Sequence, residues 1–252
     1  MNRLIVVTGP TASGKTTLAI ELARAIGTEI ISADSRQLFR DLSIGTARPT
    51  PEELAAVPHH FIATLDLDEY YSAAQYEEDV LRLLPDIFSR CGGNAVMCGG
   101  SMMYVDAVCD GIDLLPTVSD ENRTRAYALY EAGGLPAVIL ELERLDPVYL
   151  RQASDLKNHK RLVHALEISL EAGRPYSSML TGEKKSRPFG ILKFAIDHPR
   201  EELFSRINRR VEVMMSQGLL EEVRRVYPHR ELNSLNTVGY KELFAYLDGQ
   251  WD

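Results

Sequence analysis

The sequence of 252 residues is poor in cysteine and contains no long apolar run. Its three cysteines, Cys91, Cys98 and Cys109, are too few and too irregularly spaced for a disulfide framework or a zinc site, so we expect reduced thiols. No stretch approaches the roughly 18 apolar residues of a membrane-spanning helix. A strand-like run follows the first residues directly, without the pattern of a signal peptide, which predicts a cytoplasmic protein with no membrane partner.

Positive charge is also scarce overall, and the net charge of −8 argues against a nucleic-acid partner. The distribution is uneven, however. The stretch from Lys157 to Arg230 holds 15 Lys and Arg against 9 Asp and Glu, whereas the rest of the chain holds 13 against 27. This asymmetry indicates a site for a polyanion, although basic runs are usually just solvated faces.

The first motif that is present is a glycine-rich loop, residues 9–16, which matches G-x-x-x-x-G-K-[ST]. The backbone N–H groups of such a loop surround a di- or triphosphate, its lysine lies against the terminal phosphates, and its last hydroxyl binds Mg²⁺. A β-branched run at 4–7 precedes the loop and an amphipathic pattern at 17–26 follows it, as the motif requires. The predicted phosphate-binding residues are Gly9, Pro10, Thr11, Ala12, Ser13, Gly14, Lys15 and Thr16, with Thr16 as the metal ligand.

A second strand-like run, 29–33, is followed at once by the polar quartet Asp34-Ser35-Arg36-Gln37. Ligands of an open parallel sheet bind at the carboxyl ends of its strands, so the quartet should face the phosphate loop. Asp34 is then either a base beside the reacting end of the ligand or the N-cap of a helix that begins at Gln37. The clustering of four polar residues favours the base.

A third strand-like run, 95–98, ends in Gly99-Gly100-Ser101. The two glycines allow the backbone to approach a ligand closely, and Ser101 can offer its hydroxyl there. The alternative is a tight turn in which Ser101 caps the next helix. An ATPase normally has a magnesium-binding Asp near such a strand end, so its absence counts against ordinary ATP hydrolysis.

Farther along, the pattern changes at Pro116, where strand-like runs give way to helical ones until about Pro188. We therefore predict an α/β fold with a P-loop NTPase-like parallel sheet in 1–115 and 189–252, and a mostly helical insertion domain over 116–188. A helix interrupted at Pro85, a strand at 191–196 and one long helix over 200–226 are expected in the core.

These motifs occur in an order that resembles the tRNA dimethylallyltransferase family, the isopentenyltransferases that modify an adenosine beside the anticodon. The resemblance covers nearly the whole chain, and the Asp34 quartet together with the phosphate loop is its most specific part. The other segments that carry it are 44–49, Gly99–Ser101 with Tyr104, Leu115-Pro116 with Arg123, Asp146-Pro147, Arg161 with 165–167, Arg206 to Val223, and 238–243.

The resemblance implies transfer of a five-carbon prenyl group from dimethylallyl diphosphate to the exocyclic amine of that adenosine. Asp34 would accept a proton from the attacking amine, and Ser101 would hydrogen-bond near the breaking bond. Lys15, Mg²⁺ on Thr16, and Arg206 or Arg210 would stabilise the departing diphosphate. The implied catalytic residues are Asp34, Ser101, Lys15, Arg206 and Arg210.

The implied partner is the tRNA anticodon stem-loop, bound by a protein that we expect to be a monomer. The implied tRNA-binding residues are Asp34, Ser35, Arg36, Gln37, Ser101, Arg123, Lys160, Arg161 and His164. Lys157, Lys160, Arg161 and His164 are expected near one helical face. The family usually has threonine where Ser101 stands and arginine where His164 stands. Its members commonly continue beyond the position of Asp252 into a basic helical segment, which affects tRNA affinity more than chemistry.

Three alternatives remain open at this point. One is a prenyltransferase acting on free adenine nucleotides, against which the helical insertion argues. Another is a phosphoryl transferase of the nucleoside-kinase kind, with ATP in the loop and Asp34 activating a hydroxyl. The last is a non-catalytic RNA-binding relative.

Overall fold

The structure, a computed structural model, describes residues 1–251 and divides into two compact units. Met1–Gly111, together with the chain from Ser186 onward, forms the first unit, and Ile112–Lys185 forms the second. The second unit begins and ends a few residues earlier than the helical insertion expected over 116–188.

The first unit is built on a five-stranded sheet in which every pairing is parallel. The strand order is β3-β2-β4-β1-β5. The strands are β1 (Arg3–Thr8), β2 (Ile30–Ser32), β3 (His59–His60), β4 (Asn94–Cys98) and β5 (Gly190–Ala195). The predicted parallel α/β core is confirmed. The sequence did not predict β3, because two residues are too few to show a periodic pattern.

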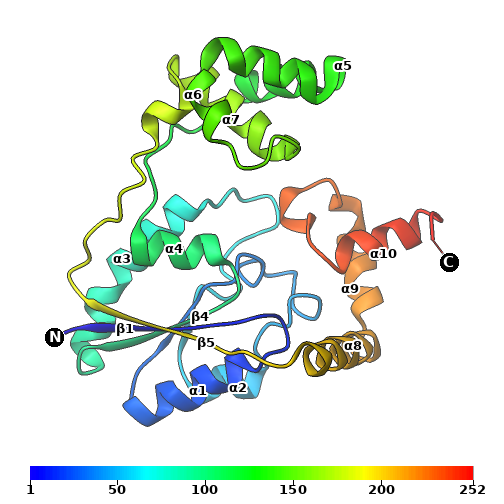
Figure 1. Cartoon of the computed structure of the whole chain (residues 1–252). Helices are drawn as coiled ribbons and strands as arrows, with labels where there is room; N and C mark the ends of the chain where they lie inside the picture. Colours follow the sequence, from blue (N-terminus) through cyan, green and yellow to red (C-terminus); the bar gives the residue numbers. More distant parts are fainter. Residues whose placement is uncertain (252) are drawn as a thin grey trace. The chain divides into compact units, whose positions relative to one another are not determined.

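Helices cover both faces of this sheet. In Figure 1, α1 (Lys15–Ile26) lies on one face, whereas α3 (Ala73–Arg90) and α4 (Met102–Asp110) lie on the other. The buried core between them includes Leu4, Val6, Ile31, Val96 and Met97, all at zero exposure. The helices of the first unit are α1 (Lys15–Ile26), α2 (Pro51–Ala56), α3 (Ala73–Arg90), α4 (Met102–Asp110), α8 (Arg200–Ser216), α9 (Leu219–Val226) and α10 (Tyr240–Leu247).

Two helix predictions in the core were wrong. The interruption expected at Pro85 is absent, since α3 continues through it to Arg90. Its apolar face, which includes the buried Val80, Leu84 and Ile87, keeps the helix on the sheet despite the lost N–H donor. Conversely, the single helix expected over 200–226 is broken at Gly218, whose φ of 98° is left-handed and which caps α9.

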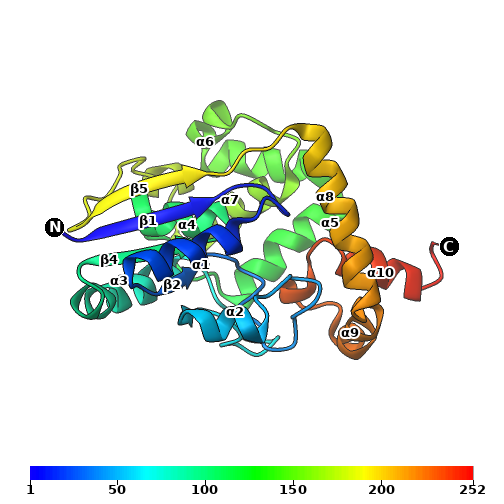
Figure 2. The same cartoon turned by 90° about the horizontal axis from the view of Figure 1, so that it is seen from below.

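The segment 219–247, here called the C-terminal segment, comprises α9, two 3₁₀ turns (Tyr227–His229 and Asn233–Leu235) and α10. Figure 2 shows α8, α9 and α10 beyond the carboxyl ends of the strands. Val223, Leu235 and Tyr240 are fully buried and form one apolar cluster with Phe39 and Leu42 from the stretch that follows β2. The C-terminal segment is thereby packed against the stretch of chain that follows Asp34.

The second unit is helical. It consists of α5 (Asp120–Leu145), α6 (Pro147–Gln152), α7 (His159–Ala172) and a 3₁₀ turn (Tyr176–Met179). Gly134, with φ 62° and ψ −161°, breaks α5 into two parts. Ala126, Leu142 and Leu162 are fully buried between α5 and α7. This unit therefore has a core of its own.

Candidate active site

The phosphate loop connects β1 to α1, and its backbone is fixed by glycine at both ends. Gly14 is left-handed (φ 91°) and caps α1, so the positive end of the helix dipole faces the loop. A Cβ on Gly9 would lie 2.8 Å from the Ile196 carbonyl oxygen, so only glycine fits there. The Lys15 ammonium turns back and donates to the Pro10 carbonyl at 2.7 Å.

An open pocket of about 400 Å³ lies over this loop. All eight residues from Gly9 to Thr16 line it, together with Asp34, Gln37, Thr46, Ala47, Gly100 and Arg210. The structure thus brings the phosphate loop and Asp34 to one cavity, although they are separated by a helix and a strand in the chain. Such a cavity can hold a polyphosphate beside a carboxylate.

Asp34 both shapes a turn and lines the pocket. Its Oδ1 accepts hydrogen bonds from the backbone N–H groups of Arg36 (2.9 Å) and Gln37 (3.4 Å). No α-helix begins at Gln37, so Asp34 is not the N-cap of a helix. Its side chain caps this turn instead. Because Asn and Asp side chains commonly cap such turns, the hydrogen bonds explain how the carboxyl is held. They do not compete with a chemical role.

Ser101 does not cap α4, although it occupies the N-cap position. Instead its Oγ accepts from the Ser35 backbone N–H at 2.9 Å, and its hydroxyl donates to the Ser35 Oγ at 3.1 Å. The strand ends come this close because of Gly99, where an added Cβ would lie 2.1 Å from the Ala33 carbonyl oxygen. Ser101 and the quartet therefore form one hydrogen-bonded group.

The charges around the pocket interact with one another. Burial lowers the pKa of Lys15, and the Arg210 guanidinium lowers it further, while the Asp34 carboxylate opposes both. Burial likewise lowers the pKa of Arg210, against the Asp34 charge. Burial raises the pKa of the Cys98 thiol to about 11, so this cysteine is a neutral thiol. Two cations close to a phosphate loop are what an anionic leaving group requires.

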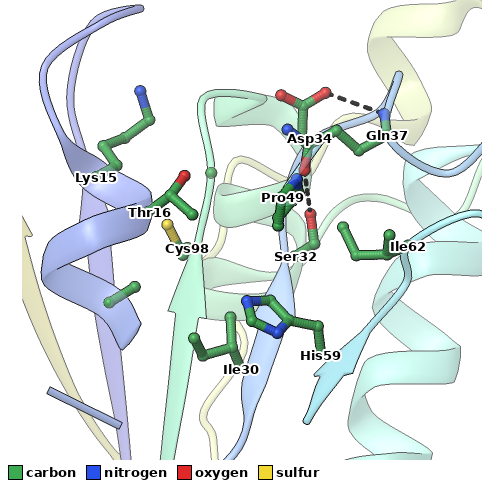
Figure 3. A pocket seen from close by; sticks show the side chains of 12 residues that line it. Lys15, Thr16, Ile30, Ser32, Asp34, Gln37, Pro49, His59, Ile62 and Cys98 are labelled. Atoms are coloured by element: carbon green, nitrogen blue, oxygen red, sulfur yellow. Dashed lines mark hydrogen bonds between the residues drawn. The ribbon is translucent and has the colours of Figure 1, made fainter. Parts of the chain in front are cut away.

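A narrower pocket extends from the same residues between α1 and the sheet. Figure 3 shows Lys15 and Thr16 on one side of it, and Asp34 and Gln37 on the other. Its remaining lining is Ala19, Ile30, Ser32, Pro49, His59, Ile62, Cys98 and Gly99. The pocket thus has a polar mouth, and its interior combines apolar side chains such as Ile30 and Ile62 with the polar Ser32 and His59. His59 and Ile62 were not predicted to line a site, because no local pattern in the sequence links them to the loop.

The two arginines proposed for the diphosphate differ in their surroundings, although they are one turn apart on α8. Arg210 lines the phosphate pocket and is partly buried. Arg206 is exposed and pairs with Glu202, with Nε 3.0 Å from Oε1. The structure therefore brings Arg210, and not Arg206, to the phosphate loop.

Other members of the quartet are engaged within the protein. The Arg36 guanidinium donates to the carbonyl oxygens of Asn233 (2.9 Å), Ser234 (3.1 Å) and Asn236 (3.3 Å). The Gln37 amide donates to the carbonyls of Thr46 (3.2 Å) and Ala47 (3.1 Å). The Arg36 side chain thus holds the C-terminal segment, a role that the sequence did not indicate.

The remaining residues proposed to bind tRNA lie on the second unit. Arg123 is on α5, and Lys160, Arg161 and His164 are on α7; all four are exposed. Lys157 precedes α7 in a turn, where its N–H donates to Asp155, so it does not share the helical face expected of it. Three basic side chains therefore remain together on α7.

Neither a membrane-spanning helix nor a cluster of metal-binding side chains is found in the part of the chain that the structure describes. Among residues 1–251, no helix is long and apolar enough to cross a membrane. In the same residues, no group of three or more His, Cys, Asp or Glu side chains could hold a metal ion by itself.

Fold and site together define a P-loop α/β protein whose pocket combines a polyphosphate cradle, a carboxylate and a partly buried arginine. The chain belongs to the IPP transferase family, whose model matches residues 37–252. This confirms the family resemblance.

Individual proteins that are similar to this chain belong to the same family. The chain is 56% identical over 248 residues to tRNA dimethylallyltransferase 1 of Phocaeicola vulgatus. The matched region covers 98% of this chain and 82% of that relative. The solved tRNA isopentenylpyrophosphate transferase of Bacillus halodurans is 33% identical, with a TM-score of 0.67 over 100% of this chain and 79% of that one. A eukaryotic dimethylallyltransferase acting on tRNA shares the fold, with a TM-score of 0.79 at 23% identity over 99% of this chain and 64% of that one.

Proposed function

We propose that this protein is a tRNA dimethylallyltransferase, which transfers a dimethylallyl group from dimethylallyl diphosphate to the exocyclic amine of an adenosine next to the anticodon. Membership of the family and the names of its relatives support the activity. The observation that carries the residue assignment is the shared pocket, in which Asp34 and Arg210 line the same cavity as the phosphate loop. The same proposal includes a cytoplasmic, monomeric enzyme.

The reaction exchanges one bond to carbon for another. The bond between the allylic carbon and the diphosphate oxygen breaks, and the electron pair leaves with the diphosphate. The nitrogen lone pair forms the new bond to that carbon, and the nitrogen loses a proton. We assign proton acceptance to the Asp34 carboxylate, and stabilisation of the departing charge to Lys15, Arg210 and the N-terminus of α1.

The donor set at the loop fits Mg²⁺. Thr16 lines both pockets, so its hydroxyl is available beside the position assigned to the diphosphate. Mg²⁺ is commonly held by one or two protein oxygens together with phosphate oxygens. When bound, the ion supplies positive charge that neutralises the leaving group.

The narrower pocket suits the hydrocarbon part of the donor. Its mouth is at Lys15, Thr16 and Asp34, and its interior includes Ile30 and Ile62. Apolar side chains at this position would keep water away from an allylic carbon that carries partial positive charge in the transition state, which protects it from hydrolysis. We therefore assign the dimethylallyl group to this pocket and the diphosphate to the wider one.

The decisive test is a transfer assay with the purified protein, Mg²⁺ and labelled dimethylallyl diphosphate. We expect label to move to an adenosine of tRNA and not to AMP. Transfer to AMP alone would establish the free-nucleotide prenyltransferase, and phosphoryl transfer from ATP in a parallel reaction would establish the kinase. If no transfer is detected in any of these reactions, the alternative of an RNA-binding protein without catalytic activity would be favoured.

We assign tRNA binding to the exposed basic side chains of the second unit. Changing Lys160 and Arg161 together to Gln should weaken tRNA binding. The slope of the logarithm of the dissociation constant against the logarithm of the salt concentration should fall by about one for each lost phosphate contact. Filter binding at several salt concentrations measures both. The control is Arg82→Gln, which removes an exposed, Glu78-paired charge from α3 and should change neither quantity. A salt slope equal to that of the wild type would contradict the assignment.

A further inference from the structure

A buried carboxylate outside the pocket connects the C-terminal segment to a loop that lines it. Glu222, on α9, is only 2% exposed. Its Oε2 accepts hydrogen bonds from the Ser43 N–H (3.0 Å), the Ser43 hydroxyl (2.6 Å) and the Ile44 N–H (3.0 Å). Its Oε1 accepts from the Gly45 N–H (2.9 Å) and the Tyr240 hydroxyl (2.6 Å).

Five donors are an unusually complete set for one carboxylate. Burial by itself raises the pKa of Glu222, but the hydrogen bonds from Gly45, Ser43, Tyr240 and Ile44 outweigh it and lower the pKa below its ordinary value. The group is therefore ionised at neutral pH. A buried ionised carboxylate destabilises the fold unless hydrogen-bond donors surround it. Movement of the loop away from α9 would take these donors from Glu222, so the carboxylate holds the loop in place.

The loop that Glu222 holds continues directly into the pocket wall. Thr46 and Ala47, the residues after Gly45, line the phosphate pocket. Their carbonyl oxygens accept both hydrogen bonds of the Gln37 amide, and Gln37 lines both pockets. A line of hydrogen bonds therefore runs from Glu222 through the loop 43–47 to Gln37, three residues from Asp34.

The same C-terminal segment is attached to the quartet a second time. Arg36 donates to the carbonyls of Asn233, Ser234 and Asn236, as described above. A Cβ on Gly45 would lie 2.5 Å from the Tyr240 ring, so loop and helix also touch closely at that point. Two independent polar attachments and one tight contact thus converge on the wall opposite the phosphate loop.

We propose that Glu222 is a positioning residue for the transfer reaction, because it fixes the loop 43–47 and through it Gln37 at the acceptor side of the pocket. Glu222 touches neither pocket and is not a catalytic residue. The inference rests on the proposed function, since it assigns Glu222 a part in that reaction.

The test is Glu222→Gln, which keeps the shape of the side chain but turns one acceptor into a donor facing N–H groups. The turnover number with tRNA should fall about 10–100-fold, because a misplacement on the order of 1 Å in a reacting constellation costs about that much. The KM for dimethylallyl diphosphate should change less than the turnover number, since the phosphate loop is untouched. Tyr240→Phe, which removes a single donor, should show a smaller loss in the same direction.

Two controls separate positioning from loss of stability. Glu221→Gln changes the adjacent exposed carboxylate, which pairs with Arg224, and should behave as the wild type. Val226→Ala removes buried methyl groups from the same apolar cluster without touching the polar contacts, so it should lower the unfolding temperature and leave turnover unchanged below it. The inference is wrong if the turnover number of Glu222→Gln equals that of Val226→Ala. If Glu222→Gln does not fold, the same comparison is made with Tyr240→Phe. A wild-type protein without transfer activity would instead refute the proposed function.

Discussion

Replacing Asp34 by Asn is expected to lower the rate of prenyl transfer by about 10²- to 10⁴-fold, the usual contribution of a positioned general base. The Asn side chain retains an oxygen at the position of Oδ1, which can still accept from the N–H groups of Arg36 and Gln37. The turn should therefore persist. Affinity for the diphosphate should be unchanged or slightly higher, because a negative charge has left a pocket that binds an anion.

Single-turnover rates with tRNA, together with calorimetric titration of inorganic diphosphate, separate these two effects. Asp41→Asn is the matched control, because Asp41 is exposed and lines neither pocket. Near-normal transfer by Asp34→Asn would mean that the carboxyl only caps the turn. Loss of diphosphate binding together with transfer would instead mean that it shapes the phosphate pocket.

Replacing Arg210 by Gln is expected to lower kcat/KM for dimethylallyl diphosphate by about 10²- to 10³-fold, as for other donors that stabilise charge developing in the transition state. Arg210 lines the phosphate pocket, and its guanidinium is close enough to Lys15 to lower the pKa of that ammonium. Its positive charge therefore acts where the leaving group develops negative charge. Steady-state rates at varied diphosphate substrate give the ratio.

Arg206→Gln provides the comparison on the same helix. Arg206 is exposed and paired with Glu202, so its loss should change kcat/KM by less than a few-fold. Equal losses in the two variants would contradict the assignment of the leaving-group contact to Arg210. A larger loss in Arg206→Gln would reverse it.

The sequence alone predicted the parts of this site that depend on neighbours in the chain. A strand, a glycine loop and a helix in direct succession specify the phosphate cradle, because the loop backbone and helix N-terminus that bind phosphate are contiguous. The position of Asp34 after β2 followed from the rule that ligands bind at the carboxyl ends of parallel strands. The order of these motifs also sufficed to recognise the family.

Tertiary structure alone decided which distant residues complete the pocket. Arg206 and Arg210 cannot be distinguished by their spacing, and only the placement of α8 brings Arg210 to the loop. The break at Gly218 was missed because a glycine inside a helical pattern is tolerated in many helices. Glu222 and Arg36 belong to this group as well, since the loop residues that donate to Glu222 and the carbonyl groups that accept from Arg36 lie more than 170 residues away along the chain. Contacts of that kind arise from packing, which brings together side chains whose local sequence patterns are unrelated.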